Sequence, residues 1–138
     1  MIILDTNVLS ALMRQKPDSV LVPWLERQRR GELWTTAINV FELRFGAEAV
    51  RDRGRRRGLS HAVDQFLRVY LADRVLHFDP AAARAAAFLE ADRKRSGRSY
   101  GSRDTLIAGI AIANRAAICT RNVRHFEDAG VAIHDPWA

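Results

Sequence analysis

The first seven residues constrain the fold more than any other stretch of the chain. Residues 1–4 are a short, uninterrupted apolar run, and the polar triplet Asp5-Thr6-Asn7 follows at once, ahead of apolar residues at helical spacing. Such a run is typical of a strand buried on both faces, and such a triplet is typical of a helix start. Ligands of open α/β sheets bind beyond the carboxyl ends of the strands, so Asp5 lies where chemistry is expected.

The rest of the chain continues this alternation of strands and helices. Further strands are predicted at 33–36, 75–78, 117–120 and 131–134, and helices at 6–14, 18–30, 37–50, 59–71, 80–95 and 102–113. Alternating elements predict parallel strand pairing with helices on both faces, so the expected fold class is α/β. The length is that of a single domain over residues 1–138.

Several boundaries of these helices rest on local signals. Gly31 is expected to end the second helix after a basic last turn, and Pro80 after Asp79 is a strong start signal. The segment 51–58 is almost wholly charged or glycine, and we predict a mobile loop there. The helix that follows Ser102 is apolar nearly all round, which predicts a buried helix.

Composition limits the binding partners and the cellular location that we expect. A net charge of +6 from 22 basic and 16 acidic residues suits a polyanionic partner, although a genome-wide preference for arginine explains the count equally well. No apolar stretch is long enough to span a bilayer and no signal peptide is recognisable, so we expect an intracellular, cytoplasmic protein. The single cysteine, Cys119, is predicted to be a buried thiol and not a nucleophile.

Three carboxylates lack the routine explanation of a helix start or a solvated helix face. Asp5 follows a buried strand, Glu42 lies among apolar residues, and Asp104 precedes the most apolar helix. Each one taken alone could be a helix cap or an exposed helix residue. If the three lie close together, their repulsion calls for a divalent cation, and hard oxygen ligands suit Mg²⁺ or Mn²⁺.

Four motifs, in this order and spacing, resemble the PIN-domain ribonucleases, and most closely the VapC-type toxins of toxin–antitoxin pairs. They are Asp5-Thr6-Asn7 after the first strand, Glu42 within 40–46, Asp104 within 102–108, and Thr120-Arg121-Asn122 ahead of Phe126. Any one of them is weak, but the four together are specific, and the resemblance covers essentially the whole chain. It implies a three-layer α/β/α sandwich with a central, mainly parallel sheet.

The resemblance also implies roles for these residues. Asp5 and Asp104 would bind Mg²⁺ or Mn²⁺ directly, and Glu42 would bind it directly or through water. Asn122 stands where the family has a fourth acid, and an amide brings no negative charge to a second metal site. Thr6 and Thr120 would be nearby hydroxyl donors. His125 could reach a phosphate, but a surface histidine is the favoured interpretation.

The chemistry expected of such a site is hydrolysis of single-stranded or looped RNA by a metal-activated water, with Glu42 orienting or deprotonating that water. The basic segments 51–57 and 93–98 would contact phosphates or simply be solvated helix ends. The resemblance implies a homodimer and a hetero-oligomer with an antitoxin. An extended antitoxin segment would lie in an apolar groove lined by the helices from Asp18 and Ala37, and could place an arginine in the acidic pocket.

Two other classes of function compete with this hypothesis. One is a non-catalytic RNA- or protein-binding module that has kept the pocket and lost turnover through Asn122. The other is a metal-dependent aspartyl phosphatase, but phosphatases of the haloacid-dehalogenase kind need a second acid two residues after the first, and that position is Asn7 here. Metal-dependent cleavage of RNA would separate an enzyme from a binding module.

Overall fold

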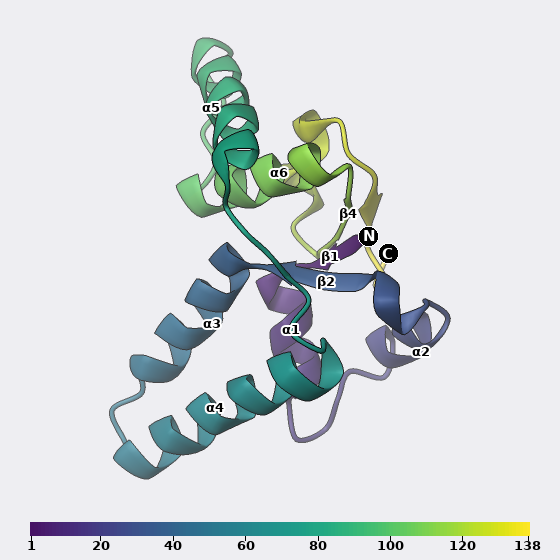
Figure 1. Cartoon of the computed structure of the whole chain (residues 1–138), viewed down its shortest axis with the longest axis vertical. Coiled ribbons are helices and arrows are strands. Elements are labelled where there is room, and N and C mark those ends of the chain that lie inside the picture. Colours follow the sequence, from purple (N-terminus) through teal and green to yellow (C-terminus); the bar gives the residue numbers. More distant parts are fainter.

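The computed structural model describes residues 1–138 and contains a five-stranded sheet in which all neighbouring strands are parallel. Its order is β3-β2-β1-β4-β5, which places β1 at the centre (Figure 1). The strands are β1 (Ile2–Leu4), β2 (Leu33–Thr36), β3 (Val75–Leu76), β4 (Ala117–Cys119) and β5 (Ile133–His134). The α/β class with a parallel central sheet is confirmed, and Asp5 follows the central strand.

Helices cover both faces of the sheet (Figure 1). The two on one face are α5 (Pro80–Arg95) and α6 (Ser102–Asn114), and those on the other are α1 (Thr6–Met13), α2 (Leu21–Glu26), α3 (Ala37–Glu48) and α4 (Arg53–Gln65). Ile3 is buried in the core beneath α5 and α6, whereas its neighbour Leu4 is buried in the core beneath α1 and α2. Successive side chains of a strand point to opposite faces, so β1 is buried on both sides, as its apolar run predicts.

Side-chain caps begin α3, which carries Glu42, and α5. The Thr36 hydroxyl accepts a hydrogen bond from the Asn39 backbone N–H at the start of α3 (3.2 Å), and Asp79 accepts one from Ala82 at the start of α5 (2.9 Å). Helix α6 is packed on α5, and its apolar residues are buried. Each of these helices begins where the sequence predicts.

The second predicted helix, 18–30, is shorter than expected. α2 spans only Leu21–Glu26, because the Asp18 carboxylate accepts hydrogen bonds from the backbone N–H groups of Val20 (2.9 Å) and Leu21 (3.0 Å) and so lies outside the helix. Gly31 does not end this helix but lies within the separate 3₁₀ turn Arg30–Glu32.

The predicted mobile loop at 51–58 is wrong, since most of it forms the first two turns of α4. Asp52 is the N-cap, and its carboxylate accepts a hydrogen bond from the Arg55 backbone N–H (2.8 Å). Gly54 and Gly58 keep negative backbone φ angles within the helix. The run continues directly into a π-helical turn, Phe66–Tyr70, so the whole stretch is one continuous helical arm packed on α3.

The predicted burial of Cys119 is confirmed. Its thiol is free and fully buried in β4, and burial raises its pKa to about 12, so it is not an activated nucleophile. None of the helices combines the length and the apolar character that a membrane span requires.

Candidate active site at the carboxyl edge of the sheet

Asp5 is the buried centre of the site, with only 3% of its surface exposed. Its Oδ1 accepts hydrogen bonds from the Thr6 backbone N–H (2.8 Å) and from Asn39 Nδ2 (2.9 Å). Its Oδ2 accepts from Thr120 Oγ1 (2.7 Å) and from Asn7 Nδ2 (3.1 Å). The donors come from α1, α3 and the loop after β4, so three chain segments orient one carboxylate. Four donors fill its roughly four lone-pair sites.

Two further carboxylates share this end of the sheet. Burial is the main cause of the raised pKa of Asp5, and the charge of Asp104 raises it further. Burial also raises the pKa of Glu42, with the charges of Asp5 and Asp104 adding to the effect. The structure therefore brings the three carboxylates that the sequence singles out within each other's electrostatic influence.

Glu42 is held on α3 by a hydrogen bond and approached by one cation. Thr6 Oγ1 donates to Glu42 Oε1 (2.8 Å), and Arg103 Nη1 lies 3.8 Å from Oε2. The Arg103 guanidinium lies over the rings of Phe41 (5.0 Å) and Phe45 (5.7 Å), which keeps it at the mouth of the site. One oxygen of Glu42 thus accepts a hydrogen bond from Thr6, whereas the other faces the half-exposed guanidinium of Arg103.

His125 is not an isolated surface histidine. Its Nδ1 lies 2.6 Å from Asp104 Oδ2, and the Tyr100 ring lies beside it with centroids 5.6 Å apart. The side chain is 40% exposed. Asp104 itself lies in the first turn of α6, so the turn Val123–His125 and the start of α6 meet at this carboxylate.

Asn122 lies at the exposed edge of the site. Its backbone N–H donates to Thr120 Oγ1 (3.0 Å), the hydroxyl that donates to Asp5, whereas its amide side chain makes no hydrogen bond within the chain. Thr6 and Thr120 both lie at the carboxylates, where the sequence reasoning expects hydroxyl donors.

Asn39 is the site residue that sequence reasoning missed. It is fully buried, and its Nδ2 donates to Asp5 Oδ1 and also to Thr6 Oγ1 (3.0 Å). The Thr36 hydroxyl donates to Asn39 Oδ1 (2.6 Å), which fixes which end of the amide faces Asp5. The signal in the sequence is an asparagine three residues after a threonine that can cap a helix. This pattern looks the same as an ordinary helix start.

The site suits a hard divalent cation bound through few protein ligands. No three Asp, Glu, His or Cys side chains are grouped closely enough to hold one ion together. Mg²⁺ commonly binds through one or two carboxylates and keeps several waters, so two carboxylates such as Asp5 and Asp104 would be enough protein ligands for it. Of the four bonds to Asp5, the one from Asn7 is the longest and is the one a cation would replace most easily. The donor set, all carboxylate oxygens with excess negative charge, fits Mg²⁺ or Mn²⁺.

The basic segment 93–98 is only partly a free surface: Lys94 and Arg95 are exposed, as expected of a solvated helix end, whereas Arg93 and Arg98 pair with acids of the chain. Arg93 is buried, with its guanidinium bound to the Asp128 carboxylate at 2.9 and 2.7 Å. Arg98 lies 3.4 Å from Asp92 and 3.4 Å from Asp128. These cations are committed to pairs within the chain, because the turn around Asp128 folds back onto the end of α5.

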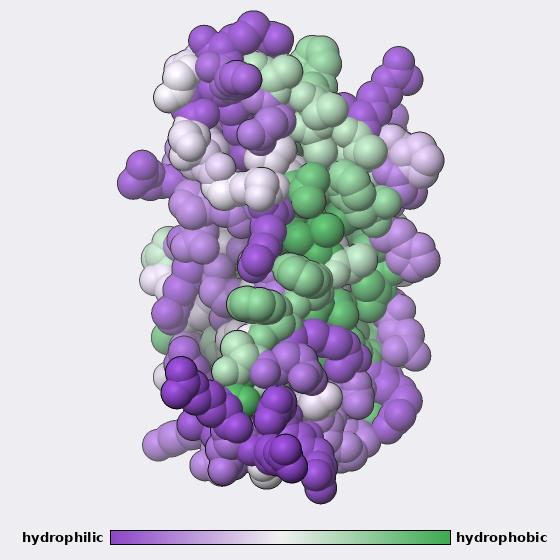
Figure 2. Space-filling model, turned by 90° about the vertical axis from the view of Figure 1, so that its left-hand side faces the viewer, coloured by the Kyte–Doolittle hydropathy of each residue, from purple (hydrophilic) through white to green (hydrophobic).

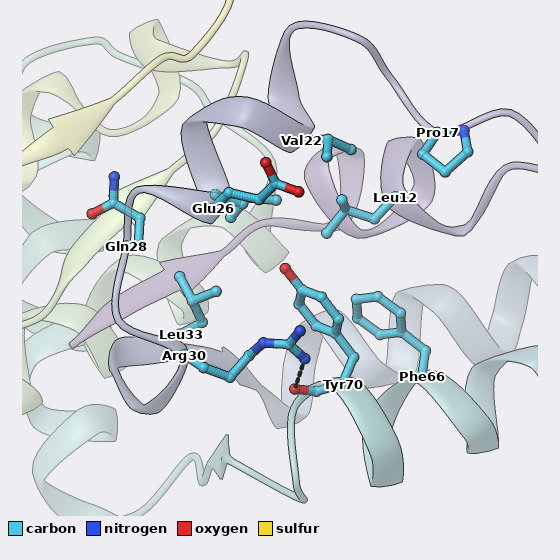
Figure 3. Close-up of a pocket in the computed structure, with 10 residues that line it drawn as sticks. Leu12, Pro17, Val22, Glu26, Gln28, Arg30, Leu33, Phe66 and Tyr70 are labelled. Carbon is cyan, nitrogen blue, oxygen red and sulfur yellow. Dashed lines mark hydrogen bonds between the residues drawn. The ribbon is translucent and has the colours of Figure 1, made fainter.

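Two hollows adjoin the helices below the sheet, and α2 and α3 line different ones. One, of about 470 Å³, lies between α2 and the Phe66–Tyr70 turn, with Leu12, Val22 and Tyr70 among its walls (Figure 3). The other, of about 540 Å³, lies among α1, α3 and α4 and reaches Thr6 and Glu42. The predicted groove between the helices from Asp18 and Ala37 is therefore replaced by two separate hollows, because α1 packs against both helices.

Comparison with known proteins agrees with this fold. The PIN domain family model matches residues 2–131. The VapC ribonuclease Y4jK of Sinorhizobium fredii is 40% identical over 99% of this chain and 98% of its own, and the toxin FitB of Neisseria gonorrhoeae is 31% identical over 99% of both. A crystal structure of FitAcB from Neisseria gonorrhoeae superposes with a TM-score of 0.89 at 31% identity, covering 99% of both chains.

The family match spans nearly the whole sequence, and every site residue discussed above falls within it. The relatives are similar along their full length, so the agreement extends beyond the short motifs. The chain belongs to the PIN domain family.

Proposed function

We propose that this protein is a metal-dependent endoribonuclease and the toxin of a VapC-type toxin–antitoxin pair. The observation that carries the proposal is the meeting of Asp5, Glu42 and Asp104 at the carboxyl edge of the sheet, where the pKa values of Asp5 and Glu42 are raised. Whole-chain relatives named as VapC ribonucleases, and a tRNA(fMet)-specific endonuclease VapC of Shigella flexneri at 33% identity, support the same activity.

In this proposal Asp5 and Asp104 hold Mg²⁺ or Mn²⁺, and Asn122 adds a neutral amide at the edge. The bound cation would supply Lewis-acid stabilisation of the phosphate and lower the pKa of a water. Asp5 is oriented by its four donors and Asp104 by His125, so little rearrangement of the ligands is needed.

Glu42 is the proposed base. Its Oε1 is occupied by the Thr6 hydroxyl, which leaves Oε2 to accept the proton of the attacking water. A raised pKa brings a carboxylate closer to the operating pH of a general base. In this proposal the water oxygen attacks phosphorus in line, the bond between phosphorus and the 3′ oxygen breaks, and the released 3′ oxygen takes a proton from solvent, which gives a 3′-hydroxyl and a 5′-phosphate. Arg103, beside Oε2, would stabilise charge on the phosphate.

The proposed substrate is single-stranded or looped RNA, because a strand within a duplex would have to be distorted to reach a recessed site. The proposed partner is an antitoxin whose extended apolar segment occupies the hollow between α2 and the Phe66–Tyr70 turn (Figure 3). Relatives of known structure were solved as FitAB and VapBC complexes, some of them with DNA fragments. A homodimer is part of the same proposal.

Replacement of Asp5 by asparagine tests the activity. We expect Asp5→Asn to lower RNA cleavage in Mg²⁺ by more than about 100-fold, since it removes a ligand charge, and EDTA to abolish cleavage by the parent. Asp64→Asn is the matched control, because Asp64 is exposed and pairs with Arg44 away from the site. Circular dichroism would establish that both variants are folded.

Two outcomes would overturn this proposal. Cleavage by Asp5→Asn at the parental rate would show that the site is elsewhere. An RNA that binds the parent but is never cut in Mg²⁺ or Mn²⁺ would instead favour the non-catalytic binding module.

A further inference from the structure

The hollow among α1, α3 and α4 joins the carboxylates to a basic end. Thr6 and Glu42 line it on the side of the site, and Arg14 and Arg55 line it elsewhere. Between them its walls include apolar residues from all three helices, namely Met13, Leu43, Ala47, Leu59, Ala62 and Val63. A single hollow of about 540 Å³ therefore combines a negative region, an apolar wall and two cations.

The two arginines have no partner within the chain. Both are exposed, and neither guanidinium takes part in an ion pair or a hydrogen bond, whereas Arg44, on α3, is paired with Asp64 at 2.7 Å. Asp52, the nearest acid in sequence to Arg55, is occupied as the cap of α4. Both guanidinium groups are therefore free to bind an anionic ligand.

Helix geometry separates Arg55 from the other arginines of α4. Arg55 lies on the same stripe as Leu59 and Ala62, which line this hollow. Arg53, Arg56 and Arg57 lie on another stripe and line a different, wholly polar hollow with Glu48 and Ser60. The lower end of the molecule, where α3 passes into α4, shows a strongly hydrophilic surface in Figure 2. Of these arginines of α4, only Arg55 therefore faces the hollow that reaches Glu42.

The spacing between Thr6, at the carboxylates, and Arg14 matches a nucleic-acid strand and not a single phosphate. Arg14 follows Thr6 by eight positions on α1, which is about 12 Å along the helix axis. A stacked nucleic-acid strand advances about 3.4 Å per nucleotide, so Arg14 lies roughly three nucleotides from a phosphate held at the carboxylates.

We propose that Arg14 and Arg55 form a phosphate-binding subsite for the RNA strand that flanks the cleaved bond. The inference rests on the proposed ribonuclease function and adds where the rest of the substrate lies. RNA is favoured over a protein segment because the unpaired groups are both cations that can bind phosphates, while the apolar residues of the hollow offer a surface for the bases.

The test compares two double variants that remove the same charge. Arg14→Gln/Arg55→Gln removes the subsite, and Arg53→Gln/Arg57→Gln removes two arginines from the other stripe of α4. With a single-stranded RNA substrate, the first should raise KM several-fold with kcat unchanged. It should also reduce the slope of log affinity against log salt by about 1.4, at about 0.7 for each lost phosphate contact. The control pair should change both quantities much less.

Substrate length and a charge-conserving variant sharpen the test. An oligonucleotide with only two nucleotides on each side of the cut should be too short to reach Arg14. Its KM should therefore not change when Arg14 is replaced. Arg14→Lys/Arg55→Lys should restore the salt slope, and this result would hold even if the glutamine variant folded poorly.

Several results would overturn the subsite while leaving the ribonuclease intact. Equal effects of the two glutamine variants on a parent that cuts RNA would show a diffuse charge effect. Unchanged RNA parameters, with or without weaker binding of a partner protein, would show that the hollow does not hold RNA. If the parent itself never cuts RNA, the proposed function fails. Cleavage by the parent is therefore measured first, before either variant is compared with it.

Discussion

Arg93 makes a set of buried contacts whose loss can be estimated from the structure. Its Nε and Nη2 donate to the two oxygens of Asp128, Nη1 donates to Thr105 Oγ1 (2.9 Å), and Nη2 also donates to the His125 carbonyl (2.7 Å). The side chain is 1% exposed. Arg93 thereby connects α5 to the start of α6 and to the turn that carries His125, the two segments that meet at Asp104.

Arg93→Met is expected to destabilise the protein by about 3–5 kcal/mol, the usual cost of removing one partner of a buried ion pair. Counting four charge-assisted hydrogen bonds at about 1.5–3 kcal/mol each would overestimate the loss. Arg98 remains 3.4 Å from Asp128, and the His125 carbonyl can bind water once the arginine is gone. A cost of this size is a large part of the roughly 5–15 kcal/mol that stabilises a typical domain.

Urea unfolding of the parent and of Arg93→Met measures this cost. Arg95→Met is the matched control, because Arg95 is exposed on the same helix and lies 3.9 Å from Asp92, a pair expected to contribute less than about 0.5 kcal/mol. Adding Asp128→Asn to Arg93→Met should recover part of the loss, since it removes the charge left unpaired. A loss below about 1 kcal/mol for Arg93→Met would refute the reasoning, because it lies well under the roughly 3–5 kcal/mol that an unpaired buried charge usually costs.

Two further predictions concern packing and pH. Gly109→Ala should lower the free energy of unfolding by about 1–3 kcal/mol, measured in urea. The added Cβ would lie 2.6 Å from both the Ala82 carbonyl oxygen and Ala86 Cβ, at the contact of α5 with α6. A variant as stable as the parent would contradict this. The hydrogen bond from Arg93 lowers the pKa of Asp128 below 3.8, so its contribution is present above that pH and lost as the pH falls through the lower, folded-state pKa. The stability difference between the parent and Asp128→Asn should therefore shrink on acidification from about pH 7 to about pH 3, and a constant difference would argue against a perturbed Asp128.

Much of the fold and part of the site could be predicted from the sequence. The buried first strand, the starts of α1, α3, α5 and α6 and the buried face of α6 all follow from apolar periodicity and capping residues, which act over a few positions. The three carboxylates stood out because no local role explained them. The segment 51–58 was misjudged because its glycines and arginines suggest a loop, whereas the Asp52 cap and the packing of α4 on α3 make it helical.

The amino-acid sequence by itself determined the alternation of strands and helices and the position of Asp5 directly after the first strand, because these depend on neighbouring residues. Only the tertiary structure decided which polar groups meet. Thr120 donates to Asp5 from 115 positions away, and Arg93 pairs with Asp128 across 35 positions. Such partners are chosen by the order of strands in the sheet and by the burial that makes an unpaired charge costly, and no local pattern records either.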